Sequence, residues 1–164
     1  MLAQALRKRL GKAVKEEKGF TLIELLAVIV IIGIIAVIAV PLISNVIGKS
    51  KSNADVATAR QIYDAARLYI TSEKAGKFTG TDASGNPTAL NITIGPKSVA
   101  DSLQKTGFLE SPIYLPSTKL EIVGGTVQFD ATGTFIKVVL DTGATDPPEF
   151  LAAEVMSATP TANR

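Results

Sequence analysis

The N-terminal part of the chain is dominated by a run of hydrophobic positions that no charge interrupts. From Leu25 to Ile43 no side chain is charged, and apart from Gly33 and Pro41 all are alanine or larger aliphatic residues. A helix of about 20 apolar residues is long enough to cross the hydrocarbon core of a bilayer. The run therefore predicts a helix that lies in lipid or in a bundle of like helices.

Beyond this run the hydrophobic positions recur every three or four residues, which is the spacing of an amphipathic helix. Polar side chains such as Asp55 and Asp64 fall on the other face, where we expect solvent. Gly76 suits the left-handed position that ends many helices. We predict one continuous helix from about Thr21 to Lys74. The buried stripe of its second half should consist of Val56, Ala59, Ile62, Tyr63, Ala66, Tyr69 and Ile70.

After Gly76 the pattern changes to short alternating runs between turn-forming residues, which is typical of strands. We predict strands at 119–123, 126–129 and 134–140, with Gly124-Gly125 as a two-residue hairpin turn. The predicted fold class is α+β, with a long N-terminal spine helix packed on a small three-stranded antiparallel meander. The sheet face toward the helix should carry Ile122, Val127, Phe129, Phe135 and Val139.

Three further elements are expected outside this meander. The segment Ala89–Ile94 alternates weakly and predicts a short strand. Ser98–Thr106 predicts a short helix, with Ser98 as its cap and Gly107 as its end. Residues 149–156 predict a turn of helix in a tail rich in proline and polar side chains.

The basic charge of the chain is concentrated before the apolar run. Residues 1–19 hold six basic and two acidic side chains, whereas the remainder holds eleven basic and thirteen acidic ones. A basic flank stays in the cytoplasm while the rest crosses the membrane. We therefore expect a cytoplasmic N-terminus and a translocated body with no electrostatic reason to bind nucleic acid.

The absence of cysteine and histidine excludes several kinds of chemistry. A disulfide or thiolate site cannot form, and the most common general base and metal ligand is missing. No serine can be activated by a histidine in a nucleophilic triad. We expect a protein that is not an enzyme and has no bound cofactor.

Three residues break the uniformity of the apolar segment. Glu24 places a carboxylate at its start, where a charge is expensive and marks a functional candidate that needs a partner. The alternative is a helix-terminal carboxylate that the macrodipole stabilises. Gly33 and Pro41 weaken the helix, which predicts either a tolerated kink or a stretch that can lose helical structure.

The sequence KGFTLIELLAVIVIIGIIAVIAVP, residues 18–41, resembles the N-terminal segment of the type IV pilin family, including pseudopilins and competence pilins. The resemblance implies that prepilin peptidase cuts between Gly19 and Phe20 and methylates the new amino group of Phe20. It implies that Glu24 forms an assembly salt bridge with the N-terminus of a neighbouring subunit. It also implies that Gly33 and Pro41 flank the part that unwinds in the filament. The family's common C-terminal disulfide cannot form here.

On this basis residues 1–19 are a leader removed on maturation, and residues 20–47 are the membrane or filament-core half of the helix. Residues 48–164 are the amphipathic half and the globular head. The expected function is a structural subunit that begins in the cytoplasmic membrane and polymerises into a surface filament. Its expected partners are further copies, prepilin peptidase, the inner-membrane assembly platform with its ATPase, and minor pilins. A pseudopilin or competence pilin, or an anchored protein that never polymerises, remains the alternative.

Two groups of charged side chains are candidates for binding, and the alternative for each is solvated surface. Asp130, Asp141 and Asp146 could bind calcium through carboxylate oxygens, yet their spacing matches no ligand set, and we expect solvated loop acids. A strip of basic side chains could contact DNA, but we expect a solvated face paired with acidic neighbours. The strip comprises Lys49, Lys51, Arg60, Arg67, Lys74 and Lys77.

Overall fold

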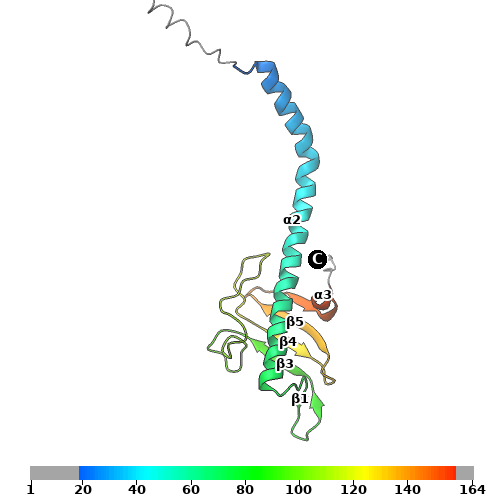
Figure 1. Ribbon diagram of the computed structural model, residues 1–164, viewed down its shortest axis with the longest axis vertical. Coiled ribbons are helices and arrows are strands. Elements are labelled where there is room, and N and C mark those ends of the chain that lie inside the picture. The colour runs from blue at the N-terminus through cyan, green and yellow to red at the C-terminus, as the bar shows by residue number, and fades with distance from the viewer. Residues whose placement is uncertain (1–18, 158–164) are drawn as a thin grey trace, which may run out of the picture. The chain divides into compact units, whose positions relative to one another are not determined.

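The computed structural model of the protein describes residues 19–157. The predicted leader, apart from Gly19, therefore lies outside the described residues. The chain divides into two units, one ending at Ser44 and the other beginning at Asn45. One long helix, six strands and one short helix are described, in the order α2, β1 to β6, α3 (Figure 1).

The long helix α2 runs from Leu22 to Glu73, 52 residues in all. It continues through Gly33 and Pro41, so the predicted single helix is confirmed. Its end is closed by Gly76, which has a φ of 74° and donates its backbone N–H to the carbonyl of Ile70 at 3.0 Å. This 6→1 bond is typical of a helix end with glycine in the left-handed region, and the same carbonyl also accepts the N–H of Lys74 at 3.0 Å.

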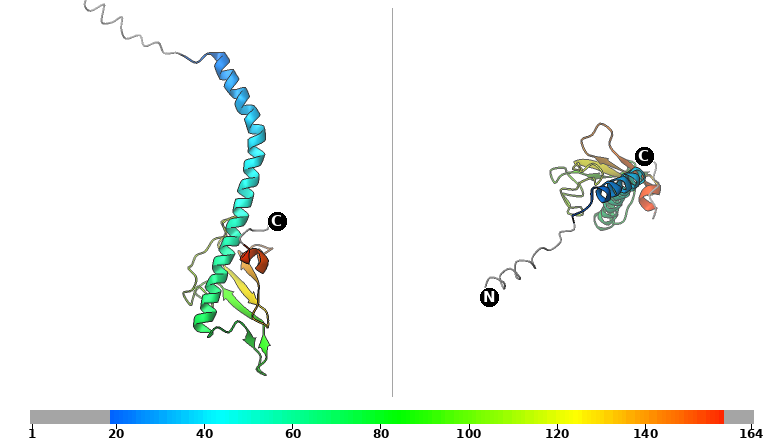
Figure 2. Two further views of the ribbon diagram at one scale, coloured as in Figure 1. Left: turned by 45° about the vertical axis from the view of Figure 1, so that its right-hand side comes forward. Right: turned by 90° about the horizontal axis from the view of Figure 1, so that it is seen from above.

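The second half of α2 buries one face against the sheet, as the periodicity predicted. Ala59, Ile62, Ala66 and Ile70 are fully buried, while Val56 is half-buried. The views in Figure 1 and Figure 2 agree that this half of α2 lies along one face of the strands. The buried residues of α2 are Asp55, Ala59, Ile62, Tyr63, Ala66, Tyr69 and Ile70.

Asp55 was predicted on the solvent side of α2, and that prediction is wrong. Its side chain is only 9% exposed, and Oδ1 accepts the backbone N–H of Ser117 at 2.9 Å. Periodicity alone could not place it, because its burial depends on a loop 62 residues further along the chain.

The strands form two antiparallel sheets instead of a single three-stranded meander. A two-stranded sheet pairs β1 with β2, and a four-stranded sheet has the order β3-β4-β5-β6. The α+β class holds, but the sheet prediction is corrected. The strands are β1 Gly80–Thr81, β2 Pro87–Thr88, β3 Leu90–Ile94, β4 Gly124–Phe129, β5 Phe135–Asp141 and β6 Glu149–Leu151.

The predicted hairpin turn at Gly124-Gly125 is also wrong, because both glycines lie inside β4. Gly125 pairs with Ile94 on one side and Leu140 on the other. Its φ of 142° and the closeness of the Val139 carbonyl leave no room for a Cβ. Glycine at this position permits a close approach of the neighbouring strands. The sequence alone does not distinguish such a glycine from one that forms a turn.

The side chains of β5 that face the core differ from those predicted. Simple alternation predicted that Val139 faces the helix. Val138 and Leu140 are fully buried instead. Gln128 pairs with Lys137 and Phe129 pairs with Phe135, so the register shifts and Ile136 is the extra residue. A one-residue bulge reverses which side chains face the core beyond it. Phe135 therefore packs against the core from before the bulge, as predicted.

Other short elements also differ from the prediction. Residues 98–106 form successive turns, not a helix, with Asp101 at a φ of 55°. The predicted strand at 119–123 is reduced to an isolated bridge from Glu121 to Tyr114. The predicted strand at 89–94 is confirmed as β3.

The tail is held by a strand and a short helix. The segment expected as a turn of helix begins as β6, which pairs with β5, and only then forms α3, Ala152–Met156. Phe150 and Val155 are buried in the core. Lys137 and Glu149 form an ion pair at 2.8 Å across the two strands. Apolar burial and strand pairing thus hold the tail in a chain that has no cysteine.

Candidate processing and assembly site

Glu24 lies in the first turn of α2 and is hydrogen-bonded to Thr21. Its Oε2 accepts the backbone N–H of Thr21 and the Thr21 hydroxyl, both at 2.8 Å. The Thr21 Oγ1 accepts the backbone N–H of Glu24 at 3.3 Å. These reciprocal bonds are a capping box, which satisfies N–H groups that the first turn leaves without partners.

The sequence reasoning did not identify Thr21 as a site residue, although the signal was present. Thr21-Leu22-Ile23-Glu24 is the pattern Ser/Thr-x-x-Glu that marks helix starts. The predicted alternative for Glu24, a carboxylate at the positive end of the helix dipole, describes its local setting. Among residues 19–157, the hydrogen-bond partner of Glu24 is a threonine.

The peptide bond between Gly19 and Phe20 lies just before the helix. Neither residue belongs to a helix or strand, and both are exposed. The Phe20 side chain is 84% exposed, and nothing lies within 4 Å of where a Cβ on Gly19 would be. The bond is sterically open, and cutting it would leave the Thr21 N–H and the capping box in place.

Gly33 and Pro41 sit within continuous helix. Pro41 has no N–H, so the carbonyl of Val37 lacks its usual helical donor. Three residues later the Ser44 hydroxyl donates to the carbonyl of Val40 at 3.0 Å, a bond of the kind that often bends helices. Both residue types weaken a helix, and loss of helical structure between them stays a prediction.

The apolar side chains in the first half of α2 are exposed, because no other described segment covers them. By length and composition this half can cross a membrane, and its most apolar window is 0% buried. Contiguous exposed apolar surface of this extent indicates contact with lipid or protein. Such a helix is consistent with a membrane-anchored precursor. A shallow groove bordered by Phe20, Glu24, Leu25, Ala27 and Val28 lies at its start.

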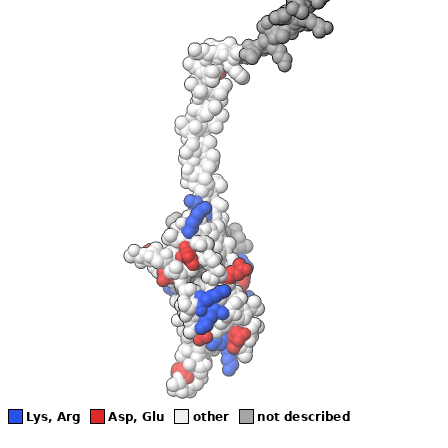
Figure 3. All heavy atoms as spheres, turned by 90° about the vertical axis from the view of Figure 1, so that its left-hand side faces the viewer, with Lys and Arg blue, Asp and Glu red and all other residues white. Residues whose placement is uncertain are grey.

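Among residues 19–157, every charged side chain except Glu24 lies in the second unit. Figure 3 shows blue and red groups interspersed there on one face. The guanidinium of Arg67 lies 5.9 Å from the ring centre of Tyr63, and the ammonium of Lys74 lies at the same distance from Tyr69. Arg67 thus packs on a ring of its own helix, and Lys74, directly after that helix, packs on another of its rings. These contacts give no support to a continuous strip for DNA.

The three loop aspartates do not gather into a metal site. Within residues 19–157, no group of three His, Cys, Asp or Glu side chains lies close enough together to hold a metal ion. Oδ1 of Asp130 instead accepts the backbone N–H groups of Thr132 and Thr134. Oδ1 of Asp141 accepts the N–H of Gly143 at 2.8 Å.

Comparison with known proteins identifies the N-terminal segment. Residues 14–40 match the family model described as the prokaryotic N-terminal methylation motif. This motif, on a long apolar N-terminal helix, fits a type IV pilin-like protein. No curated protein and no solved structure matches the chain.

For a pilin-like chain, the motif implies processing by prepilin peptidase and pilus assembly. The matched segment contains Gly19, Phe20, Glu24 and Gly33 and ends at residue 40, one residue before Pro41. In the structure, Gly19 and Phe20 share an exposed peptide bond before the helix, and Glu24 is a capped carboxylate in its first turn. The unit that begins at Asn45 lies entirely outside the match.

Proposed function

We propose that this protein is the structural subunit of a type IV pilus and acts as a building block, not as an enzyme. The observation that carries the proposal is the methylation motif at residues 14–40 on a helix whose apolar half is not buried. In this proposal the precursor spans the cytoplasmic membrane with its N-terminus inside, and the mature chain is part of an extracellular filament. Residues 1–19 are the leader that is removed.

In this proposal, assembly depends on two opposite charges, the ammonium of Phe20 and the carboxylate of Glu24, each of which requires a partner. A cut before Phe20 creates an ammonium, which methylation leaves charged, and Glu24 supplies a carboxylate four residues further on. An isolated charge in apolar surroundings is costly, and a well-placed opposite charge offsets that cost. The ammonium of a second copy can meet Glu24 and set the axial register between subunits. Head-to-tail contacts that do not close into a ring then give an open helical fibre.

The apolar surface has a matching role. In the membrane it contacts lipid, and in the filament it contacts the same surface of other copies. Prepilin peptidase, the inner-membrane assembly platform with its ATPase, and minor pilins are the proposed partners. A pseudopilin or competence pilin would use the same N-terminal segment, and an anchored protein that never polymerises would leave its apolar helix in lipid.

The processing step is tested by mass spectrometry of material sheared from the cell surface. The proposal expects a mature chain that begins with N-methylated Phe20 and lacks residues 1–19. A mature chain that still begins at Met1 would exclude processing, and with it both filament-forming alternatives. Correctly processed protein found only in membranes, with none in sheared filaments, would favour the anchored protein.

The assembly role of Glu24 is tested with a substitution that keeps its helix cap. Glutamine can serve at this position of a capping box, so Glu24→Gln removes the charge while retaining an acceptor for the Thr21 N–H. We expect normal cleavage and at least a tenfold loss of filaments, because an unpaired ammonium remains in apolar surroundings. Glu73→Gln, at the exposed far end of α2, is the matched control and should assemble normally.

The pair Glu24→Gln and Glu24→Ala separates the two roles of the side chain. If Glu24→Gln assembles normally while Glu24→Ala does not, capping is the whole role of Glu24 and the salt bridge is refuted. If both fail and both are cleaved, the charge is required.

A further inference from the structure

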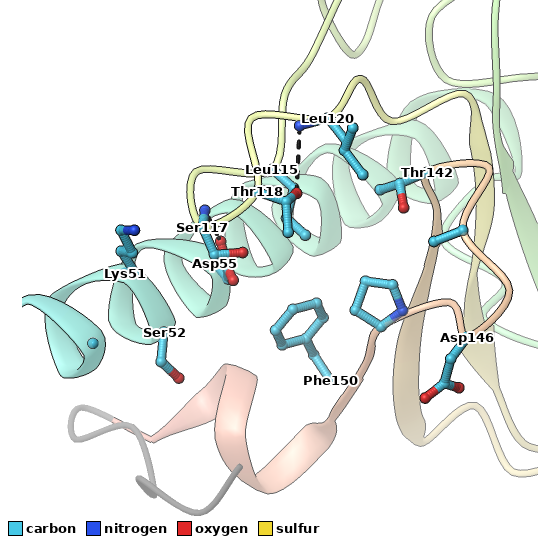
Figure 4. A pocket seen from close by; sticks show the side chains of 13 residues that line it. Lys51, Ser52, Asp55, Leu115, Ser117, Thr118, Leu120, Thr142, Asp146 and Phe150 are labelled. Atoms are coloured by element: carbon cyan, nitrogen blue, oxygen red, sulfur yellow. Dashed lines mark hydrogen bonds between the residues drawn. The ribbon is translucent and has the colours of Figure 1, made fainter.

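The second unit contains a cavity that the proposed filament function does not use. Its volume is about 430 Å³, within the range of about 300–1,000 Å³ typical of small-molecule sites. It lies among α2, the loop at 115–120, the loop that follows β5, and β6 (Figure 4). Residues far apart in sequence therefore line one partly open cavity.

The most constrained polar group in this cavity is the carboxylate of Asp55. The residue is 9% exposed, and its Oδ1 is held by the Ser117 N–H at 2.9 Å. Oδ2 accepts no hydrogen bond from the described residues, it is not sealed from solvent, and Asp55 lines the cavity. Among residues 19–157 no cation lies within 4.0 Å of Asp55. A buried carboxylate with one neutral donor is incompletely compensated.

The rest of the lining combines an apolar surface with hydroxyl groups. Leu115 and Phe150 are buried, and the hydroxyl residues Thr118 and Thr142 also border the cavity. Figure 4 shows Lys51 to one side of Asp55 and Asp146 across the cavity from it. The cavity is thus suited to a positively charged group on a short apolar stem.

Other ligand classes fit less well. An anion would meet two carboxylates, Asp55 and Asp146, against the single cation Lys51, all three of which line the cavity. A metal ion would need more ligands, and no group of three acidic side chains gathers in the described part of the chain. An alkylammonium group needs only one well-placed carboxylate and an apolar contact for its stem.

We propose that this cavity binds a primary ammonium carried on a short aliphatic stem, with Asp55 as the acceptor. The ammonium donates to Oδ2 of Asp55, and its stem packs on Leu115 and Phe150. A free aliphatic amine or a lysine side chain of a second copy has this chemistry.

The test uses the mature chain in detergent micelles and follows backbone amide signals by NMR. n-Butylammonium is the probe, and n-butanol and butyrate are its neutral and anionic counterparts. Butylammonium should shift the amides of Leu115, Ser117 and Thr118 in a saturable manner. Because hydrogen bonds to charged groups are the stronger ones, butanol should bind at least about tenfold more weakly. Butyrate should not bind.

Asp55→Asn is the matching variant, since its side-chain oxygen can still accept the Ser117 N–H. It should weaken butylammonium binding at least about tenfold, while Asp64→Asn on the exposed face of α2 should leave binding unchanged. Unshifted amides at Val127 and Val138 would establish that the variant core is intact.

Three results would overturn the proposal: no saturable shift with butylammonium, equal binding of butanol, or full affinity in Asp55→Asn. The probe comparison in the wild-type chain decides the matter even where Asp55→Asn fails to fold. If the same amides also shift with protein concentration alone, and do so only when Asp55 is present, the ammonium comes from a second copy. If they are insensitive to protein concentration, a free amine is the ligand.

Discussion

At the residue scale, the pair Thr21 and Glu24 matters most for the proposed assembly. Glu24 accepts two hydrogen bonds from Thr21 at 2.8 Å, so its carboxylate has partners inside its own chain before any second copy arrives. The proposed salt bridge must therefore add to the capping box or displace its hydroxyl donor. Cleavage before Phe20 leaves both capping residues in the mature chain.

Thr21→Val should loosen the start of α2, because it removes the hydroxyl that accepts the Glu24 N–H and donates to Oε2. Loss of an N-cap side chain costs about 1 kcal/mol, which corresponds to roughly fivefold faster hydrogen exchange. The rate at the Glu24 amide, measured by NMR in micelles, checks this. Thr71→Val, whose hydroxyl bonds to the Arg67 carbonyl inside α2, is the control. Unchanged hydrogen exchange at the Glu24 amide would show that the capping box does not stabilise the start of α2.

Gly125→Ala should severely destabilise the second unit. Glycine here has a φ of 142°, and an added Cβ would overlap the Val139 carbonyl. Backbone strain together with a clash against a neighbouring strand costs about 2–4 kcal/mol. The urea midpoint of the second unit measures the loss. Gly124→Ala is the adjacent control, because its Cβ would meet Asp141 Cβ at an ordinary 3.6 Å. Equal midpoints for the two variants would contradict the assignment.

At the element scale, two exposed turns are built in the same way. Asp82 begins the turn between β1 and β2, and Asp130 begins the turn between β4 and β5. Each carboxylate accepts backbone N–H groups two and four residues later. The Asn86 backbone and side-chain donors lower the pKa of Asp82. The Thr132 hydroxyl and the Thr134 N–H lower the pKa of Asp130.

This turn chemistry predicts an acid-dependent loss of stability. A carboxylate whose pKa is lowered by folding stabilises the protein above its unfolded pKa of about 3.9, and the effect is lost as the pH falls through the folded value. Asp130→Asn should therefore be less stable than the wild type near neutral pH, and the difference should shrink below about pH 4. Urea unfolding across this range measures the difference. Asp64→Asn controls for the change in net charge. A difference that grows toward low pH would contradict the assignment.

At the scale of the whole molecule, the two units need different surroundings. The unit that ends at Ser44 contains no buried residue among those described, so it gains stability only from lipid or other chains. The unit that begins at Asn45 holds the entire hydrophobic core. Because α2 runs through both units, the first part of this helix requires apolar surroundings and the second part packs on the core of a unit that faces water.

A truncated chain of residues 45–164 should therefore fold in water without detergent, because every core residue is retained. The full chain should require detergent or lipid. Circular dichroism and a cooperative urea transition of the truncated chain are the measurements. A chain that starts at Thr71 is the control; it lacks the whole buried stripe of α2 and should not fold. An unfolded 45–164 chain would show that the second unit depends on the first.

Much of the fold could be predicted from local pattern. The bounds of α2, the buried stripe from Ala59 to Ile70 and the closing role of Gly76 depend on residues within a few turns of one another. The candidate processing and assembly residues could also be named from the sequence, since Gly19, Phe20 and Glu24 lie within one short segment. Thr21 was missed there although its capping signature is equally local.

What the sequence by itself determined is the helix, its change from an apolar to an amphipathic surface, and the motif at its start, because helical hydrogen bonds and periodicity are short-range. Tertiary structure alone decided the strand neighbours of Gly125, the bulge at Ile136 and the burial of Asp55. Each of these depends on a partner that the chain reaches only after folding: Val139 for the glycine, the β4 register for the bulge, and Ser117 for the aspartate. Side chains within one turn of a helix meet whatever the rest of the chain does, whereas a strand's inward face and a buried carboxylate exist only once distant segments have paired.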